Sequence, residues 1–273
     1  MSEQTSIIVI KVGGRFFDEL LAVDGNKHPL LSAIKALQSR GKQVVLVHGG
    51  GDQVQAQLKA LNMHSEKIDG LRVTPFSHMP VVAGVLCGYL NKTLVARSAS
   101  IGLKSVGISL ADGNIAECVQ VSQHLGAVGR PIAKDAALLK QLFNNNMLPI
   151  VASIGTDKTG NLYNVNADHA AICIAQLLNA KLLLLSDVSG VLNSDKIKLA
   201  QLNAKQAQQM IDDKIITDGM IVKVLAAQDS ADLLGSAVTI GSWNDLSAMT
   251  ENDTVFGTQI FPRAEAGANP HMQ

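Results

Sequence analysis

The sequence predicts an α/β fold built around a parallel β-sheet. Short apolar runs of strand length alternate with longer periodic segments, which is the pattern of α/β proteins. The run at residues 44–47 is apolar throughout, as expected of a strand that is covered on both faces in a parallel sheet. A chain of 273 residues is long enough to bury a substantial core, in one large domain or in two lobes.

The expected strands follow from the apolar runs, each of which is rich in Val, Ile or Leu. In chain order they are residues 7–12, 44–47, 148–153, 181–186 and 237–242. Two further regions are β-rich. Residues 105–122 are expected to form paired strands around the Asp112-Gly113 turn, and the turn-rich residues 155–165 a hairpin or a hinge.

Helices are expected in the longer segments between these runs. They are residues 28–40, 52–61, 78–100, 134–145, 166–179, 203–213 and 219–234. The end of the chain, residues 263–273, has the composition of a loose tail.

Composition argues against several classes of function. Lys and Arg number 23, as do Asp and Glu, and no basic stripe with interleaved aromatic residues occurs, so we expect no nucleic-acid partner. Cys87, Cys118 and Cys173 lie far apart without Cys-x-x-Cys spacing, which favours a reducing cytoplasm over a disulfide framework or a zinc site. The first residues show no signal-peptide pattern, and the prolines and polar residues within 73–91 argue against a membrane span.

Two expected strands run into glycines. Lys11 lies near the end of one strand and is followed by Gly13 and Gly14, and the strand at 44–47 leads into residues 49–51, all glycine. Ligands of open parallel sheets bind at the carboxyl ends of the strands, where bare backbone N–H groups can meet phosphate oxygens. A tight strand-to-helix turn remains the alternative. The G-x-G-x-x-G, G-x-x-x-x-G-K-[ST] and protein-kinase signatures do not occur, so a different scaffold would have to bind phosphate.

Further polar residues lie where a ligand could use them. Lys223 falls in the first turns of a helix that Thr217 or Asp218 would cap, where the helix dipole disfavours a cation by about 0.3 to 1 kcal/mol unless an anion is also present. Arg72 lies in a loop between Gly70 and Pro75, and its fork matches a carboxylate, although a solvated loop arginine is the alternative.

Asn164, Asn166 and Asp168 alternate before an apolar helix. One of them is expected to cap that helix, but an extended segment would point all three to one side. Residues 186–192 follow the leucine-rich strand and form either a nucleotide-facing loop or a simple turn.

The segments KVGG, VHGGG, GLRVT, NVNADHAA, LLSDVSGVL and IITDGMIVKV occur in this order along the chain. Together they resemble the N-acetylglutamate kinases of the amino acid kinase family, over residues 7–261. The resemblance implies a three-layer αβα sandwich around a largely parallel open sheet. It also implies an acyl-amino-acid-binding and dimerisation lobe in 1–175, an ATP-binding lobe in 176–262 and a flexible tail in 263–273. The implied reaction is ATP-dependent phosphorylation of the γ-carboxylate of N-acetyl-L-glutamate in arginine biosynthesis, with Mg²⁺ carried by ATP.

The resemblance also implies roles for individual residues. Lys11 and Lys223 would stabilise the transferring phosphoryl group, and Asp168 would hold both ammonium groups. Arg72 and Asn164 would take the α-carboxylate of the substrate. The expected substrate site comprises Gly14, Gly50, Gly51, Arg72, Asn164 and Asn166. The expected nucleotide site comprises Asp187, Val188, Ser189, Gly190, Val191, Leu192, Ile215, Ile216 and Thr217. No metal ligand from the protein is expected.

The implied nucleophile is a carboxylate, which is ionised at neutral pH with a pKa near ~4.3 and needs no general base. The enzyme would align two anions and neutralise their charge with lysines, glycine N–H groups and Mg²⁺. One departure from the family is visible, because Arg15, Phe16 and Phe17 stand where we expect a small or aliphatic loop.

Two alternatives remain open at this point. One is a sister kinase acting on carrier-linked aminoadipate, aspartate or UMP, against which Arg72 favours a free α-carboxylate. The other is a catalytically silent nucleotide or amino acid sensor, which would not need the charged set of Lys11, Asp168 and Lys223.

A homodimer is expected through the helix at 78–100, although its apolar face could also be core. The residues proposed for the contact are Val82, Val85, Leu86, Tyr89 and Leu90. Family members that arginine inhibits carry an additional amino-terminal helix, for which the six residues before the first strand are too few. The expectation is therefore a plain dimer that arginine leaves active.

Overall fold

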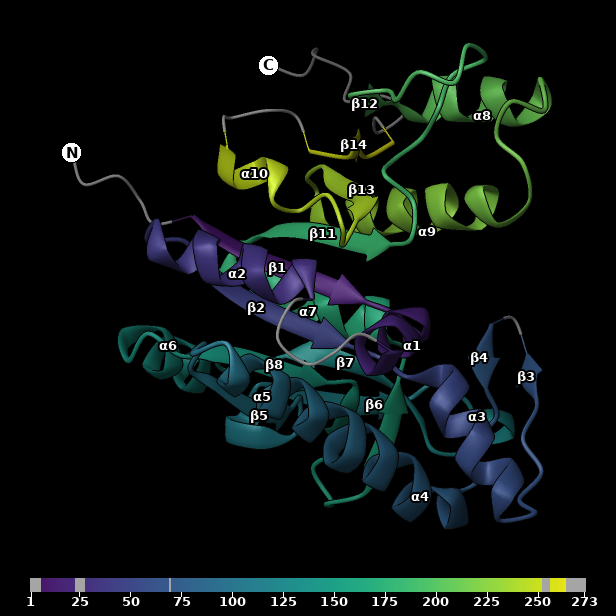
Figure 1. Ribbon diagram of the computed structural model, residues 1–273. Helices are drawn as coiled ribbons and strands as arrows, with labels where there is room; N and C mark the ends of the chain where they lie inside the picture. Colours follow the sequence, from purple (N-terminus) through teal and green to yellow (C-terminus); the bar gives the residue numbers. More distant parts are fainter. Residues whose placement is uncertain (1–5, 23–27, 69, 252–255, 264–273) are drawn as a thin grey trace, which may run out of the picture.

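The computed structural model describes residues 6–22, 28–68, 70–251 and 256–263 (Figure 1). The expectations for the residues before the first strand and for the tail at 264–273 fall outside these ranges. Residue 263 itself is tied to the body of the protein, because the Arg263 guanidinium contacts Asp229 at 2.7 Å and Asp232 at 3.3 Å.

An eight-stranded sheet crosses the whole molecule. Its strands, in their order across the sheet, are β12 (Gln201–Leu202), β14 (Thr258–Ile260), β13 (Val238–Ser242), β11 (Lys181–Ser186), β1 (Ile7–Val12), β2 (Gln43–His48), β8 (Leu148–Ala152) and β5 (Ser105–Ser109). Neighbouring strands are parallel except β13 and β14. The apolar runs become these strands because both faces are covered, and residues 44–47 are fully buried.

Helices pack on both faces of this sheet, which gives the expected layers. Figure 1 shows α2 (Pro29–Ser39) in front of the sheet and α7 (Ala167–Leu178) behind it. The front helix also contacts α10 (Ala248–Glu251), and α7 contacts α9 (Asp218–Leu234). The other helices are α1 (Gly14–Ala22), α3 (Gly51–Ala60), α4 (Met79–Ala83), α5 (Asn91–Ser100), α6 (Ala137–Asn144) and α8 (Ala204–Asp212).

The first of these helices corrects an expectation. We expected a loop after Lys11, but residues Gly14–Ala22 form α1. Phe16, Phe17 and Leu20 are buried on one side of it, so the aromatic residues that depart from the family pattern serve as the apolar face of a helix.

A small closed barrel lies beside the main sheet. Its strands are β10 (Leu162–Val165), β7 (Val128–Ala133), β6 (Ala116–Gln120) and β9 (Ile154–Thr156). The hairpin expected within 155–165 is confirmed, because β9 and β10 are antiparallel. A two-stranded ribbon of β3 (Lys67–Ile68) and β4 (Leu71–Arg72) completes the sheets of the described chain.

The pairing expected within residues 105–122 is wrong. Both strands form, but β5 pairs with β8 in the main sheet and β6 with β7 in the barrel. The chain turns at Asp112, whose carboxylate accepts hydrogen bonds from the Ser109 N–H (2.6 Å) and hydroxyl (2.8 Å). This local turn directs the chain from one sheet into the other instead of closing a hairpin.

Residues 76–100 form one long helical run, made of η1 (Phe76–His78), α4, the π-helical segment η2 (Gly84–Leu90) and α5. Val82, Val85, Leu86 and Leu90 are buried within the chain, and only Tyr89 of the expected dimer residues is exposed. The apolar surface that we assigned to dimerisation is therefore mostly core. By length and composition alone this run could cross a membrane, but a core helix of a soluble protein passes the same test.

The parallel register places the functional segments at one edge of the sheet. Val12 at the end of β1 pairs with His48 at the end of β2 and with Leu185 in β11. The two glycine loops and the residues after β11 therefore leave the sheet side by side. The proposed boundary between two lobes stays a prediction; it falls inside α7, and the sheet continues across it.

Candidate active site

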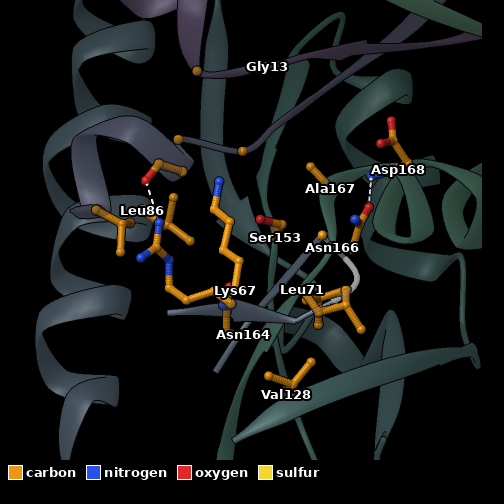
Figure 2. A pocket seen from close by; sticks show the side chains of 18 of the residues that line it. Gly13, Lys67, Leu71, Leu86, Val128, Ser153, Asn164, Asn166, Ala167 and Asp168 are labelled. Carbon is orange, nitrogen blue, oxygen red and sulfur yellow. Dashed lines mark hydrogen bonds between the residues drawn. The ribbon is translucent and has the colours of Figure 1, made fainter. Parts of the chain in front are cut away.

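Two adjoining cavities open at this edge and share Lys11, Gly13, Gly14 and Asp168. The first, of about 210 Å³, also contains Gly49, Gly50, Gly51, Arg72, Ser153, Asn164 and Asn166 in its wall (Figure 2). The second, of about 350 Å³, also contains Arg15, Asp52, Ser186, Asp187, Lys223 and Trp243. The structure thus brings together the lysines, the glycine loops and every residue expected for the substrate site.

Lys11 lies between the two cavities and is largely enclosed, with 18% of its side chain exposed. Its ammonium group contacts an oxygen of Asp168 at 2.8 Å. That aspartate lies in the first turn of α7, where a negative charge is favoured by the helix dipole. The apolar strand therefore ends in a paired cation, as the sequence requires.

Asn166 is the helix cap expected among the three alternating polar residues. Its side-chain oxygen accepts hydrogen bonds from the N–H groups of Asp168 (2.8 Å) and His169 (3.4 Å), as Figure 2 shows for the first of these. Asn164 instead donates to the Thr74 hydroxyl at 3.2 Å and lines the first cavity. The cap fixes the backbone at Asp168, so Asn166 helps to position the carboxylate that contacts Lys11.

Arg72 is not a solvated loop residue, because only 7% of it is exposed. Its guanidinium donates to the Gly51 carbonyl (2.7 Å), to the Ser65 hydroxyl (2.5 Å) and to the Gln55 side chain. Burial lowers the pKa of Arg72, and the nearby Asp52 carboxylate opposes this shift. A guanidinium has five N–H donors, so after these three hydrogen bonds two remain for a ligand.

The second glycine loop is shaped by a close approach. Gly50 has φ +157° and ψ 40°, and a Cβ atom built on it would lie 2.1 Å from a methyl carbon of Leu90. Gly51 begins α3 and has open space where its Cβ would be. Bare backbone at the start of a helix is a preferred place for anionic groups.

His48 packs beneath the glycine loop and contacts its first residue, Gly49. Its side chain is fully buried, Nδ1 lies 2.8 Å from the Gly49 carbonyl oxygen, and Nε2 lies 3.1 Å from the Asn91 amide. Burial lowers the pKa of His48 to about 4, against a small opposing effect of the Gly49 hydrogen bond. The imidazole is therefore neutral near pH 7.

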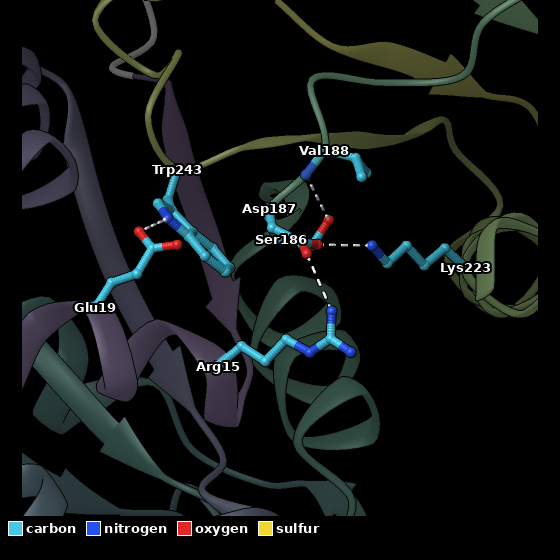
Figure 3. Close-up of polar contacts among 7 residues, drawn as sticks. All are labelled: Arg15, Glu19, Ser186, Asp187, Val188, Lys223 and Trp243. Atoms are coloured by element: carbon cyan, nitrogen blue, oxygen red, sulfur yellow. Dashed lines mark hydrogen bonds and ion pairs between the residues drawn. The ribbon is translucent and has the colours of Figure 1, made fainter.

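In the second cavity, Lys223 contacts Asp187 at 2.9 Å, and Arg15 reaches the other oxygen of the same carboxylate at 3.1 Å (Figure 3). The Lys223 hydrogen bond is the main cause of the lowered pKa of Asp187. We expected Asp168 to hold both lysines, but in the described structure it pairs with Lys11 while Lys223 pairs with Asp187. Each lysine has its own aspartate because they approach from different elements, β1 and α9.

Of the residues expected to bind the nucleotide, one lies in the described wall of the second cavity and the others do not. Asp187 lines the second cavity, but Val191 and Ile216 are core residues, and the Val191 N–H donates to the Thr258 hydroxyl at 2.9 Å. Val188, Ser189, Gly190, Leu192, Ile215 and Thr217 are not in the described wall of this cavity.

Trp243, which was not among the residues predicted from the sequence, is buried and lines the second cavity. Its indole N–H donates to Glu19 at 2.7 Å (Figure 3). Trp243 directly follows β13, so the rule that selected the glycine loops, a position at the carboxyl end of a parallel strand, would have selected it too.

Comparisons with known proteins agree with this geometry. The sequence profile of the amino acid kinase family matches residues 6–241. Acetylglutamate kinase from Mannheimia succiniciproducens is 44% identical over 93% of this chain and 99% of its own. The crystal structure of smu.665 from Streptococcus mutans UA159 has a TM-score of 0.75 at 30% identity, covering 94% of this chain and 99% of that one.

N-acetylglutamate synthase from Neisseria gonorrhoeae also has a TM-score of 0.75, at 21% identity over 96% of this chain and 60% of that one, and so shares the fold. The profile match spans most of the chain and includes the strand that carries Lys11 and the residue Asp187 directly after β11. This chain belongs to the amino acid kinase family.

Proposed function

We propose that this protein transfers the γ-phosphoryl group of ATP to the γ-carboxylate of N-acetyl-L-glutamate, forming N-acetyl-L-glutamyl 5-phosphate in arginine biosynthesis. The observation that carries the proposal is the Lys11–Asp168 pair in the wall shared by two cavities. One cavity offers Arg72 and Asn164 to a small acid, and the other offers Lys223. Relatives that are named acetylglutamate kinase and match nearly the full chain support the same reaction.

The first cavity would bind the acyl amino acid. The two free donors of Arg72 would take its α-carboxylate, with the Asn164 amide beside it. This places the side-chain carboxylate of the substrate toward Lys11 and the glycine loops. A carboxylate is ionised at neutral pH, so the site needs no general base, and none is assigned.

The second cavity would bind ATP with its terminal phosphates toward Lys11 and Lys223. The two ammonium groups and the glycine N–H groups would neutralise the charge that spreads over the transferring phosphoryl group. Asp168 and Asp187 would act as positioning residues that hold the lysines in place. Alignment of two anions is then the main contribution of the protein.

Mg²⁺ would arrive with the nucleotide and would neutralise phosphate charge. The described residues contain no cluster of three or more His, Cys, Asp or Glu side chains that could hold a metal. The second cavity does present the carboxylates of Asp52, Asp168 and Asp187, and Mg²⁺ is commonly held by one or two carboxylates together with substrate phosphates. The donor set therefore fits an ion shared with ATP.

A hydroxamate assay tests the reaction. Hydroxylamine traps an acyl phosphate, so ATP-dependent hydroxamate formation would be measured with N-acetylglutamate, glutamate, aspartate and aminoadipate in parallel. We expect N-acetylglutamate to be the preferred acceptor. Preference for another acceptor would favour a sister kinase, and ATP binding without product from any acceptor would favour a sensor.

Arg72→Ala is expected to weaken N-acetylglutamate binding by about 10- to 100-fold, because hydrogen bonds to a charged group are worth about 1.5 to 3 kcal/mol. ATP binding should be retained, since Arg72 lines only the first cavity. Calorimetry with each ligand separates the two effects, with the exposed Arg40→Ala as control. Unchanged affinity for N-acetylglutamate would remove Arg72 from the substrate site.

We further propose a cytoplasmic homodimer. The free cysteines Cys87, Cys118 and Cys173 fit a reducing compartment. Tyr89, which is 57% exposed, lines an open groove with Leu61 and Val81 and offers apolar surface to a second copy of the chain. Light scattering of the purified protein is expected to give twice the chain mass of 28.8 kDa. A monomer mass at micromolar concentration would contradict the dimer.

A further inference from the structure

Among the described residues that line the second cavity, Arg15 is the cation to which the proposed reaction gives no role. It is the second residue of α1, and it lines the second cavity together with Lys11 and Lys223. Its guanidinium lies 3.1 Å from Asp187, on the oxygen that Lys223 does not contact (Figure 3). Two cations therefore flank one carboxylate at the place where the terminal phosphates of ATP would lie.

The ion pair with Asp187 holds the Arg15 side chain only weakly. The Arg15 side chain is 76% exposed, and exposed ion pairs of this kind contribute little to stability. The lowered pKa of Asp187 has the Lys223 hydrogen bond as its main cause, and Arg15 contributes least among the causes. The carboxylate would keep a cationic partner if Arg15 moved away.

The helix that carries Arg15 is, in contrast, firmly held. Phe16 and Phe17 are fully buried, and the Phe16 ring meets the Trp243 indole edge-on at 5.8 Å. Glu19 accepts the Trp243 N–H at 2.7 Å. The backbone at Arg15 is therefore fixed beside the cavity, and its long side chain is the part that is free to change partner.

The position of Arg15 favours an anionic partner. It lies in the first turn of α1, where the helix dipole repels a cation and attracts an anion, and no acidic residue occupies that turn. The preceding Gly13 and Gly14 leave bare backbone at the same end of the helix. A phosphate oxygen there would satisfy the dipole and the guanidinium together, and a guanidinium fork matches phosphate geometry.

We propose that Arg15 is a nucleotide phosphate-binding residue, which exchanges Asp187 for a terminal phosphate oxygen when ATP enters the second cavity. The proposal rests on the proposed function only in taking ATP as the ligand of this cavity. It makes Arg15 a third cation around the phosphates, supplied by a helix that the family pattern did not lead us to expect.

Binding measured without an acceptor tests the proposal. Trp243 is the single tryptophan of the chain and lines the cavity, so its fluorescence is the readout, with MgATP and AMP as probes. Arg15→Gln is expected to weaken MgATP binding about tenfold and AMP binding less than twofold, because AMP lacks the terminal phosphates. Arg15→Lys should fall between, since it keeps the charge and loses the fork. Arg40→Gln, at an exposed arginine that directly follows α2, is the control and should change neither.

A double-mutant cycle with Asp187→Asn separates direct contact from an indirect effect. If Arg15 touches phosphate, Arg15→Gln weakens MgATP binding in the Asp187→Asn background as well. Loss of the effect in that background, equal loss for AMP and MgATP, or unchanged MgATP affinity in folded Arg15→Gln would each overturn the proposal. A protein that binds MgATP through Arg15 but phosphorylates no N-acetylglutamate would overturn the proposed function and leave this inference in place.

Discussion

Lys11→Ala and Lys223→Ala are each expected to lower kcat by about 100- to 1000-fold, the effect of removing one preorganised group that stabilises transition-state charge. The Michaelis constant for N-acetylglutamate should change far less, because in the proposed site Arg72 and Asn164 would supply ground-state binding of that substrate. Steady-state kinetics with both substrates varied measures the split.

The structure makes these two variants informative. Each lysine is held by a separate aspartate, Lys11 by Asp168 and Lys223 by Asp187, so removing one leaves the other in place. The exposed Lys42→Ala is a matched control for loss of one positive charge. Thermal unfolding checks that each variant is folded. Near-normal turnover in a folded variant would take that lysine out of the mechanism.

Gly50→Ala is expected to lower the free energy of unfolding by at least about 2 kcal/mol and to abolish most of the activity. The added Cβ would lie 2.1 Å from a Leu90 methyl carbon, and Leu90 is fully buried, so the loop or the helix must shift. Overpacking costs about 1 to 3 kcal/mol, and φ +157° adds backbone strain for any residue with a Cβ. Urea unfolding measures the change.

Gly51→Ala is the control for this prediction, because a Cβ there meets no atom within 4 Å. It should unfold at a urea concentration close to that of the wild type. If Gly50→Ala is as stable as Gly51→Ala, the contact with Leu90 does not shape the loop.

The elements that the sequence predicted well are those governed by local patterns. The apolar strands, the helices between them and the glycine loops at strand ends each depend on residues close in the chain. Because parallel strands end at one edge, these loops and Lys11 were also expected to meet.

Long-range pairing was harder to predict. Strand β5 pairs with β8 and not with β6, the next β-rich segment in the chain, because the turn at Asp112 redirects the chain. Likewise, Lys223 pairs with Asp187 and not with Asp168. This pairing depends on how α9 packs against the sheet. The spacing of residues in the sequence indicates neither this strand pairing nor this ion pair.

The helix α1 was missed for a different reason. The expectation of a loop at Arg15, Phe16 and Phe17 came from the family resemblance, whereas the spacing of the apolar residues Phe16, Phe17 and Leu20 is a helical signal in its own right. The consequence was the omission of Arg15 from the candidate site.

The buried His48 affects how the acid side of a pH–activity curve should be interpreted. Its pKa is lowered to about 4 in the folded protein, from an ordinary value near 6.5. Between these two pH values the unfolded chain binds a proton at His48 and the folded chain does not. The stabilising contribution is complete above about pH 6.5 and declines as the pH falls toward 4. Protonation would put a second N–H group on the ring at Nε2, where it would face the Asn91 amide nitrogen 3.1 Å away and disturb that contact beneath the glycine loop. Activity lost through unfolding in that range would therefore report a proton bound by the unfolded chain, in an enzyme whose chemistry transfers none.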